Sequence, residues 1–210
     1  MTGAADHRAA SAGKRASPGA GHPAGLILAA GEGRRFGRPK ALVEIDGERF
    51  VDRAIRLLAE GGCAPLVVVS GATAVGDLAP DVVTVHNSAW AEGMGTSLRA
   101  GLAALDSYPV DVVVVALVDQ PWLGPEAVRR LLTARSGGAA VAVATYDGRR
   151  GNPVLLGREV WPGVAALAQG DVGARAFMAA NPGLVTEVPC DGTGSPDDID
   201  HPDDLLDAQP

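Results

Sequence analysis

The sequence predicts an α/β protein with a three-layer, Rossmann-like fold, in which helices cover both faces of a mostly parallel central sheet. Apolar runs without polar alternation, at residues 25–30, 66–70 and 111–118, are typical of strands that are buried on both faces. Helical stretches separate these runs, as in parallel strands joined by right-handed crossovers. Aromatic residues make up only 4% of the chain, which favours small side chains packed between sheet and helices.

The length and charge of the chain favour one domain that binds a small ligand. Of the 210 residues, 47% are hydrophobic, which is enough for a single substantial core. Residues 1–23 show no hydrophobic period, so we expect a disordered N-terminal tail followed by one domain over residues 24–210. The formal net charge of −7 argues against nucleic-acid binding, because that requires clustered cations.

The cysteines and the distribution of apolar residues bear on cellular location. Cys63 and Cys190 lie far apart in the sequence and form neither a metal-binding pair nor a disulfide framework. No stretch approaches the roughly 20 apolar residues that cross a bilayer. The first residues also lack the apolar region of a signal peptide. We therefore expect a cytoplasmic protein that does not bind membranes.

The first apolar run leads directly into a loop suited to phosphate binding. Glycines at positions 31, 33 and 37 let the backbone approach a ligand closely, so that amide groups point at phosphate oxygens. Positive charge comes from Arg34, Arg35, Arg38 and Lys40. The glycine spacing is that of neither a Walker loop nor a dinucleotide-binding loop. A glycine-rich turn with surface arginines is the alternative interpretation.

Helices and strands alternate between this loop and the central strand. We expect an extended segment over residues 41–45, a turn at Asp46-Gly47, a helix over 50–60, a strand at 66–70, a weak helix over 73–78 and a strand at 82–85. Thr96 or Ser97 is a candidate cap for a helix that runs to about Asp106. With the glycines before it, the start of this helix is a second candidate anion site.

Asp119 follows the most hydrophobic strand of the chain, in the sequence Asp119-Gln120-Pro121. A carboxylate just beyond the carboxyl end of a central parallel strand lies in the crevice where open α/β sheets bind ligands. Pro121 ends the strand pairing there. An aspartate that only caps the following turn is the structural alternative.

The remaining third of the chain continues the alternation. We expect a helix from Gly124-Pro125-Glu126, a strand at 139–145, a loop over 147–153, a strand at 154–156, helices over 159–167 and 171–180, and a last strand at 184–188. Asp171 is the predicted cap of the second of these late helices.

Several motifs resemble those of one nucleotidyltransferase family. The run Leu28-Ala29-Ala30-Gly31-x-Gly33-x-Arg35-x-Gly37-x-Pro39-Lys40 is similar to the signature loop of the molybdenum cofactor cytidylyltransferases. Asp119-x-Pro121, Gly170-Asp171-x-Gly173-Ala174-Arg175 and the closing Asp198-Ile199-Asp200 resemble further motifs of that family, although His201 stands where a threonine is usual. The resemblance spans about residues 25–206 and implies the fold of the nucleotide-diphospho-sugar transferases.

The resemblance implies a set of site residues. We expect the nucleotide to contact residues of the first loop, of the glycine-containing helix start and of the strand ends: Leu28, Ala29, Ala30, Gly31, Glu32, Gly33, Arg34, Arg35, Lys40, Ser70, Gly71, Asn87, Gly93, Gly95, Ser97 and Asp119. The expected acceptor-binding residues are Gly151, Asn152, Pro153 and Asp171.

The resemblance also implies a reaction, in which CTP donates a cytidylyl group to the terminal phosphate of a molybdopterin-type cofactor and pyrophosphate leaves. Arg35, Lys40 and Asp119 are the expected catalytic residues. Mg²⁺ is the expected cofactor, held by Asp119 with Asp198 or Asp200. A phosphate acceptor is itself the nucleophile, so no Ser/His/Asp or Cys/His arrangement is needed. The apo-molybdoenzyme that receives the product is a possible partner.

Other functions are open at this stage. Guanylyl members of the family tend to have Gly where this chain has Ala30, and a larger side chain there crowds a purine, which favours CTP over GTP. An enzyme acting on another phosphorylated acceptor would keep the first loop and Asp119 but need a different acceptor pocket. A non-catalytic molybdopterin carrier would bind the pterin without magnesium-dependent pyrophosphate release.

Overall fold

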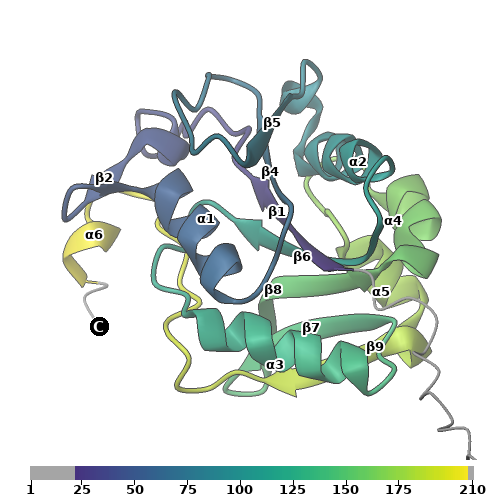
Figure 1. The fold of residues 1–210 in the computed structure, drawn as a ribbon. Coiled ribbons are helices and arrows are strands. Elements are labelled where there is room, and N and C mark those ends of the chain that lie inside the picture. The colour runs from purple at the N-terminus through teal and green to yellow at the C-terminus, as the bar shows by residue number, and fades with distance from the viewer. Residues whose placement is uncertain (1–21, 208–210) are drawn as a thin grey trace, which may run out of the picture.

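A computed structural model describes residues 22–207, in which helices pack on both faces of one large sheet (Figure 1). The first strand, β1, runs over His22–Leu28, so the last two residues of the predicted tail belong to the sheet. The rest of that tail lies outside the described residues. The predicted three-layer α/β fold is confirmed.

The main sheet has seven strands in the order β5-β4-β1-β6-β8-β7-β9. β4, β5 and β6 run over Leu66–Ser70, Val82–His86 and Val110–Leu117; β7, β8 and β9 over Val141–Tyr146, Arg149–Gly157 and Val185–Pro189. All neighbours are parallel except that β8 lies antiparallel between β6 and β7. A two-stranded hairpin, β2 (Glu44–Ile45) and β3 (Glu48–Arg49), lies apart from it.

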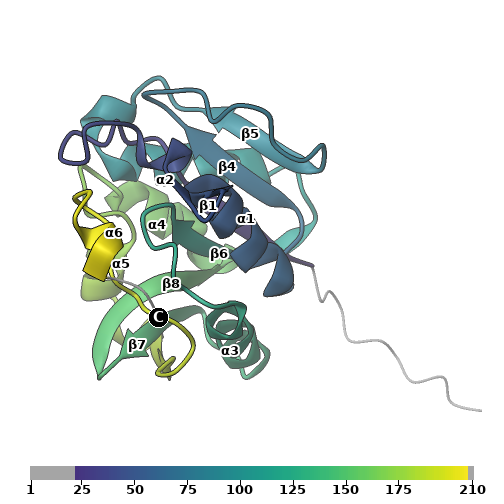
Figure 2. The same ribbon diagram turned by 90° about the vertical axis from the view of Figure 1, so that its left-hand side faces the viewer.

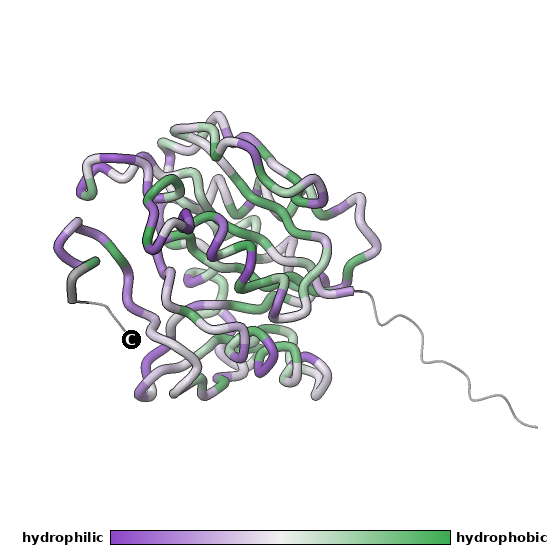
Figure 3. Tube along the Cα trace, turned by 60° about the vertical axis from the view of Figure 1, so that its left-hand side comes forward, coloured by the Kyte–Doolittle hydropathy of each residue, from purple (hydrophilic) through white to green (hydrophobic). Residues whose placement is uncertain are grey.

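Helices lie on both faces of the sheet (Figure 2). Two buried clusters of side chains join them to it, one on each face. One cluster holds α1 (Phe50–Glu60) and α3 (Pro125–Ser136); the other holds α2 (Met94–Leu105), α4 (Trp161–Leu167) and α5 (Arg175–Ala180). The hydrophobic residues concentrate along the central strands, as Figure 3 shows. Short 3-10 helices, η1 to η4, cover Lys40–Leu42, Trp90–Glu92, Arg158–Val160 and Pro182–Leu184, and α6 covers Asp204–Asp207.

This topology gathers the predicted functional loops at one edge of the sheet. Because β1, β4 and β6 are parallel neighbours, the loops that follow them emerge on the same side. Backbone hydrogen bonds link these loops: Ala72 N donates to Ala30 O at 3.0 Å, and Val118 N donates to Leu28 O at 3.3 Å. The edge that forms is the expected place for a ligand.

Five local predictions are wrong. In the segment 41–45, which we expected to be extended, the first residues belong to η1 and only Glu44–Ile45 form a strand. Residues 73–78 form no helix. Helix α2 begins at Met94 after Gly93, so Thr96 and Ser97 lie inside its first turn instead of capping it. The segment 147–153 is a tight turn at Asp147-Gly148 followed at once by β8, and not a loop. Helix α5 begins at Arg175, and Asp171 accepts a hydrogen bond from Met94 N at 3.2 Å instead of capping its own helix.

Within residues 22–207, none of the helices has the length and apolar character needed to span a membrane.

Candidate active site

A cleft of about 590 Å³ opens at the carboxyl edge of the parallel strands. The first loop forms one wall, with Gly31, Gly33, Arg35 and Lys40 among its lining residues. The other walls come from η2 and the start of α2, the end of β6, the start of α5 with the loop before it, and the C-terminal segment. Their lining residues are Trp90, Ala91, Gly93, Met94, Ser97, Leu117, Val118, Asp119, Asp171, Arg175, Asp198 and Asp200. Segments that are distant in sequence therefore meet around one space.

The first loop has the compact shape that its glycines predict. Gly33 has a φ of +67°, and a Cβ there would overlap the carbonyl oxygen of Arg38, so only glycine fits. Gly37 N donates to Gly33 O at 2.8 Å and closes the loop on itself. The loop ends in η1, which places Lys40 back toward the sheet. Phe36 is buried and anchors the loop to the core.

Lys40 joins the two carboxylates on the other side of the cleft. Its Nζ lies 3.0 Å from Asp119 Oδ2 and 2.6 Å from Asp200 Oδ1. Arg35 adds a contact at 2.7 Å from its guanidinium to Asp200 Oδ2. Ile199 N donates to Asp119 O at 2.9 Å, so the backbone also fixes the C-terminal segment beside the end of β6. The three predicted catalytic residues are thus brought together.

The charges in this cluster shift each other's pKa values. Burial by itself lowers the pKa of Lys40, but the charges and hydrogen bonds of Asp119 and Asp200 outweigh it, so the pKa lies above the ordinary 10.5. The hydrogen bond from Lys40, with the charges of Lys40 and Arg35, lowers the pKa of Asp200. Both groups are therefore charged at neutral pH.

Asp198 behaves differently from its neighbour two residues on. Desolvation of its carboxyl, followed by the charges of Asp119 and Asp200, raises its pKa above 3.8. Unlike Asp200, Asp198 forms no ion pair within the described residues.

The donor set in the cleft suits a hard cation. Asp119, Asp198 and Asp200 supply carboxylate oxygens, the ligands that Mg²⁺ prefers. Among residues 22–207, no group of three or more His, Cys, Asp or Glu side chains is arranged as a complete metal site. Mg²⁺ usually takes one or two protein carboxylates and completes its coordination with phosphates and water.

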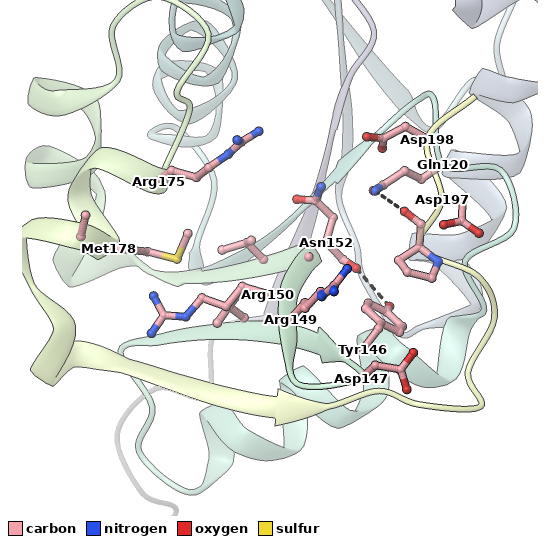
Figure 4. A pocket seen from close by; sticks show the side chains of 15 residues that line it. Gln120, Tyr146, Asp147, Arg149, Arg150, Asn152, Arg175, Met178, Asp197 and Asp198 are labelled. Atoms are coloured by element: carbon pink, nitrogen blue, oxygen red, sulfur yellow. Dashed lines mark hydrogen bonds between the residues drawn. The ribbon is translucent and has the colours of Figure 1, made fainter. Parts of the chain in front are cut away.

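A second cavity, of about 910 Å³, adjoins the cleft, and residues of β8 form part of its lining (Figure 4). Its walls come from the turn between β7 and β8, from α5 and from the C-terminal segment. The polar lining residues include Tyr146, Asn152, Arg149, Arg150 and Gln120. Tyr146 Oη donates to Asn152 O at 3.0 Å, and Gln120 Nε2 donates to Pro196 O at 2.8 Å. Both bonds lie on the same side of the cavity, where they hold the start of β8 and the C-terminal segment in place (Figure 4).

Most of the predicted nucleotide-binding residues line the cleft. The ones that do are Leu28, Ala30, Gly31, Glu32, Gly33, Arg34, Arg35, Lys40, Gly93, Ser97 and Asp119. The cleft lining does not include Ala29, Ser70, Gly71, Asn87 or Gly95.

The five predicted residues outside the lining have structural contacts instead. Asn87 is buried, and its Nδ2 donates to Thr96 Oγ1 at 2.7 Å and to Ser97 Oγ at 3.0 Å, which holds the start of α2. Gly71 lies against Trp90 and Ala30, and Gly95 against the backbone of Ala168, so that a Cβ at either glycine would clash. Ala29 and Ser70 are buried.

The predicted acceptor residues divide between the two spaces. Gly151 and Asn152 line the larger cavity, whereas Pro153 does not. Asp171 lies in the lining of the cleft. Sequence reasoning missed Arg175 as a site residue, although the Gly170-Asp171-x-Gly173-Ala174-Arg175 motif already marked it. It also missed Gln120, which is 6% exposed and carries an unpartnered Oε1 at the cavity wall.

Comparison with known families agrees with this geometry. The family described as the MobA-like NTP transferase domain matches residues 25–185. The chain belongs to this family. The matched region contains the first loop, Asp119 and Arg175, while Asp198 and Asp200 lie beyond it. The resemblance noted in the sequence predicted a nucleotidyltransferase, and the family match confirms that class of enzyme.

Named relatives of the chain differ in activity. The chain is 38% identical to the nicotine blue oxidoreductase of Paenarthrobacter nicotinovorans over 188 residues, which is 84% of this chain and 91% of that protein. It is 32% identical to the molybdenum cofactor guanylyltransferase of Rhodobacter capsulatus over 193 residues, 89% of this chain and 94% of the relative. Both matches cover more than four fifths of each chain, so the similarity extends over the whole domain.

A solved structure shares the fold. Rv0371c from Mycobacterium tuberculosis H37Rv is 25% identical, with a TM-score of 0.77 over 90% of this chain and 98% of that one. The same protein has also been solved in complex with manganese, where the match is 26% identical with a TM-score of 0.72 over 89% of this chain and 97% of that chain. A divalent metal ion thus binds a relative of this fold.

Proposed function

We propose that the chain transfers the cytidylyl group of CTP to the terminal phosphate of a molybdopterin-type cofactor and releases pyrophosphate. The observation that carries this proposal is the convergence of Arg35 and Lys40 from the first loop with Asp119 from the central strand in one cleft. Family membership and the guanylyltransferase relative support the reaction class.

We favour CTP over GTP because of the side chain at position 30, in the lining of the cleft. Ala30 lines it, is 7% exposed and lies against Gly71, so its methyl group cannot move away from a base. A larger group at this point narrows the space for a purine and leaves room for a pyrimidine. The guanylyl members that the sequence resembles tend to have glycine there.

The reaction requires two anions to meet and a third to leave. An oxygen of the acceptor phosphate forms a bond to the α-phosphorus, and the bond from that phosphorus to the oxygen bridging to the β-phosphate breaks, so that pyrophosphate departs with the electron pair. The main barrier is electrostatic repulsion, and the protein lowers it by positioning and by charge stabilisation. Loop amides with Arg35 and Lys40 would hold the β- and γ-phosphates and stabilise the leaving pyrophosphate.

Asp119 with Asp198 or Asp200 would hold Mg²⁺, which supplies charge neutralisation for the phosphate oxygens when it is bound. For a carboxylate to bind Mg²⁺, Lys40 must give up its ion pair with Asp119 or Asp200. The triphosphate can then pair with the ammonium group of Lys40 instead. Arg35 is 68% exposed at its side chain and is free to turn from Asp200 to a phosphate.

Pyrophosphate release from each of the four NTPs, with and without molybdopterin, tests the proposal. We expect magnesium-dependent release with CTP only when molybdopterin is present. Release with GTP instead would assign the guanylyl reaction, and release with another phosphorylated compound would assign a different acceptor. Molybdopterin binding without release from any NTP would leave a carrier and contradict the proposal.

A second candidate follows from the 38% identical oxidoreductase. Both cysteines in the chain are buried, and burial raises the pKa of Cys63 to about 12, so these thiols do not supply electrons. An oxidoreductase built on this chain would need a redox nucleotide in the cleft. Oxidation of NADH or NADPH in the presence of a quinonoid dye, without pyrophosphate release, would favour this candidate.

A further inference from the structure

The cleft and the larger cavity adjoin, and few described residues belong to both. Arg175 and Asp198 are the ones that line both spaces. Figure 4 shows Arg175 extending from α5 and Asp198 placed on the C-terminal segment at the other side of the cavity. Under the proposed function, this junction is where the acceptor must meet the nucleotide.

Among the described residues, two cations of these spaces have no ion pair or side-chain hydrogen bond: Arg149, which lines the larger cavity alone, and Arg175, which lines both spaces. Lys40 and Arg35 pair with Asp119 and Asp200, and Arg150 pairs with Glu187 at 2.8 Å. Within residues 22–207, the guanidinium of Arg175 forms neither an ion pair nor a hydrogen bond, so its planar set of donors is free to bind an anion. Asp198 opposite it repels anions, which leaves Arg175 as the cation of the junction.

The backbone beneath Arg175 is firmly placed. Arg175 begins α5, whose Phe177 and Met178 are buried in the core cluster with α2 and α4. Gly163 of α4 lies so close to the Phe177 ring that a Cβ there would clash, so the two helices pack without a gap. Helix α5 therefore anchors the side chain that reaches into the junction.

We propose that Arg175 binds the phosphate of the acceptor and holds one of its oxygens toward the α-phosphorus of the nucleotide. The inference rests on the proposed function and narrows its substrate class to phosphate monoesters whose remaining part fits the larger cavity. A monoester dianion supplies the electron pair of the new bond itself, so Arg175 orients it and removes no proton. Its two-pronged hydrogen bonding suits a phosphate better than a single ammonium group does.

The test compares phosphate binding in variants of three arginines. In the presence of saturating magnesium and α,β-methylene CTP, which fills the cleft without reacting, inorganic phosphate is titrated and its binding measured by calorimetry. We expect R175Q to weaken phosphate binding by about tenfold to a hundredfold, the loss typical of a charge-assisted hydrogen bond. R175K should recover part of it. R129Q, on the exposed face of α3, is the control for loss of a surface arginine.

Turnover gives the second readout. R175Q should raise the KM for molybdopterin by a similar factor and change the affinity for the CTP analogue much less. An unchanged midpoint of urea unfolding shows that the variant is folded. Wild-type turnover together with unchanged KM in R175Q, no phosphate binding by the wild type, or a larger loss in R149Q than in R175Q would each overturn the inference. Phosphate binding that depends on Arg175 in a wild-type protein that releases no pyrophosphate would instead contradict the proposed function alone.

Discussion

At the scale of single residues, the site is a balance of opposite charges around Lys40. The sequence placed Asp119 at the strand end and Lys40 in the loop, because residue type and position relative to apolar runs are visible there. It left open whether Asp198 or Asp200 is the second carboxylate. Which of the two carboxylates lies closer to Lys40 depends on the side-chain directions in an irregular segment. Such a segment has no sequence periodicity from which these directions could be predicted. In the structure Asp200 is paired with Lys40, and Asp198 is not.

Replacement of Lys40 or Asp119 by alanine should lower turnover by about a hundredfold or more, because each removes one charge that stabilises the reacting phosphates. Pyrophosphate release under saturating substrates measures the effect. Arg38→Ala is the matched control: this cation lies in the same loop but outside the cleft lining, over the ring of Phe36. Near wild-type release in either alanine variant would remove that residue from the chemistry.

Asp198→Asn should make the protein more stable at pH 7 and less active. The pKa of Asp198 is raised in the folded state, so its ionised form is disfavoured by folding. The cost is absent below the unfolded pKa, about 3.9, and is present in full above the folded one. The stability advantage of Asp198→Asn should therefore shrink as pH falls from 7 toward 3, which urea unfolding at several pH values measures. An advantage that grows on acidification would contradict the assigned environment.

At the scale of elements, the start of α2 is held by contacts that spacing does not reveal. The sequence predicted a helix there and also predicted the bounds of α1 correctly, because a strong apolar stripe and the Gly61-Gly62 stop define that element. It assigned Asp171 to the wrong helix. The Asp171 carboxylate instead accepts a hydrogen bond from Met94 N, 77 residues away in the sequence. Only tertiary packing brings these two segments together.

Gly93 should tolerate no side chain. It has a φ of +110°, and a Cβ there would overlap the backbone of Gly170. We expect Gly93→Ala to lower the free energy of unfolding by about 2–4 kcal/mol, from backbone strain plus displacement of the neighbouring loop, and to weaken nucleotide binding. Chemical unfolding and nucleotide titration measure both effects.

Gly138→Ala is the control for Gly93→Ala. Gly138 has a similar φ of +100°, but a Cβ added there would meet no described atom within 4 Å, so only the backbone strain of about 1–3 kcal/mol remains. If the two variants lose the same free energy of unfolding, the contact with Gly170 does not contribute to the effect of Gly93→Ala.

At the scale of the whole molecule, ion pairs in the cleft join segments near the two ends of the described chain. Arg35 and Lys40 lie near its beginning and Asp200 near its end, 165 and 160 positions away. The sequence indicated the three-layer architecture, since buried strands and amphipathic helices alternate. It did not indicate that β8 reverses direction, because an apolar run has the same pattern in a parallel and an antiparallel strand.

A nucleotide that bridges these segments should stabilise the whole fold. At about a hundred times its dissociation constant, CTP with magnesium should add about 2.7 kcal/mol to the free energy of unfolding. In thermal unfolding, each kcal/mol corresponds to a rise in Tm of about 2–4 °C for a chain of this size, and we expect a smaller rise with GTP at the same concentration. A larger rise with GTP would contradict the preference assigned to Ala30.

The reversed strand β8 and its partner β7 form a hairpin that contributes walls to the larger cavity and none to the cleft. Under the proposed function, this hairpin contacts the acceptor and takes no part in binding the nucleotide, although Arg175 and Asp198 line both spaces. A change in the length or sequence of the β7–β8 hairpin can therefore alter which acceptor binds. The first loop and Asp119, which would bind the triphosphate, need not change. This independence of the two sites favours the evolution of relatives that share one fold and differ in activity.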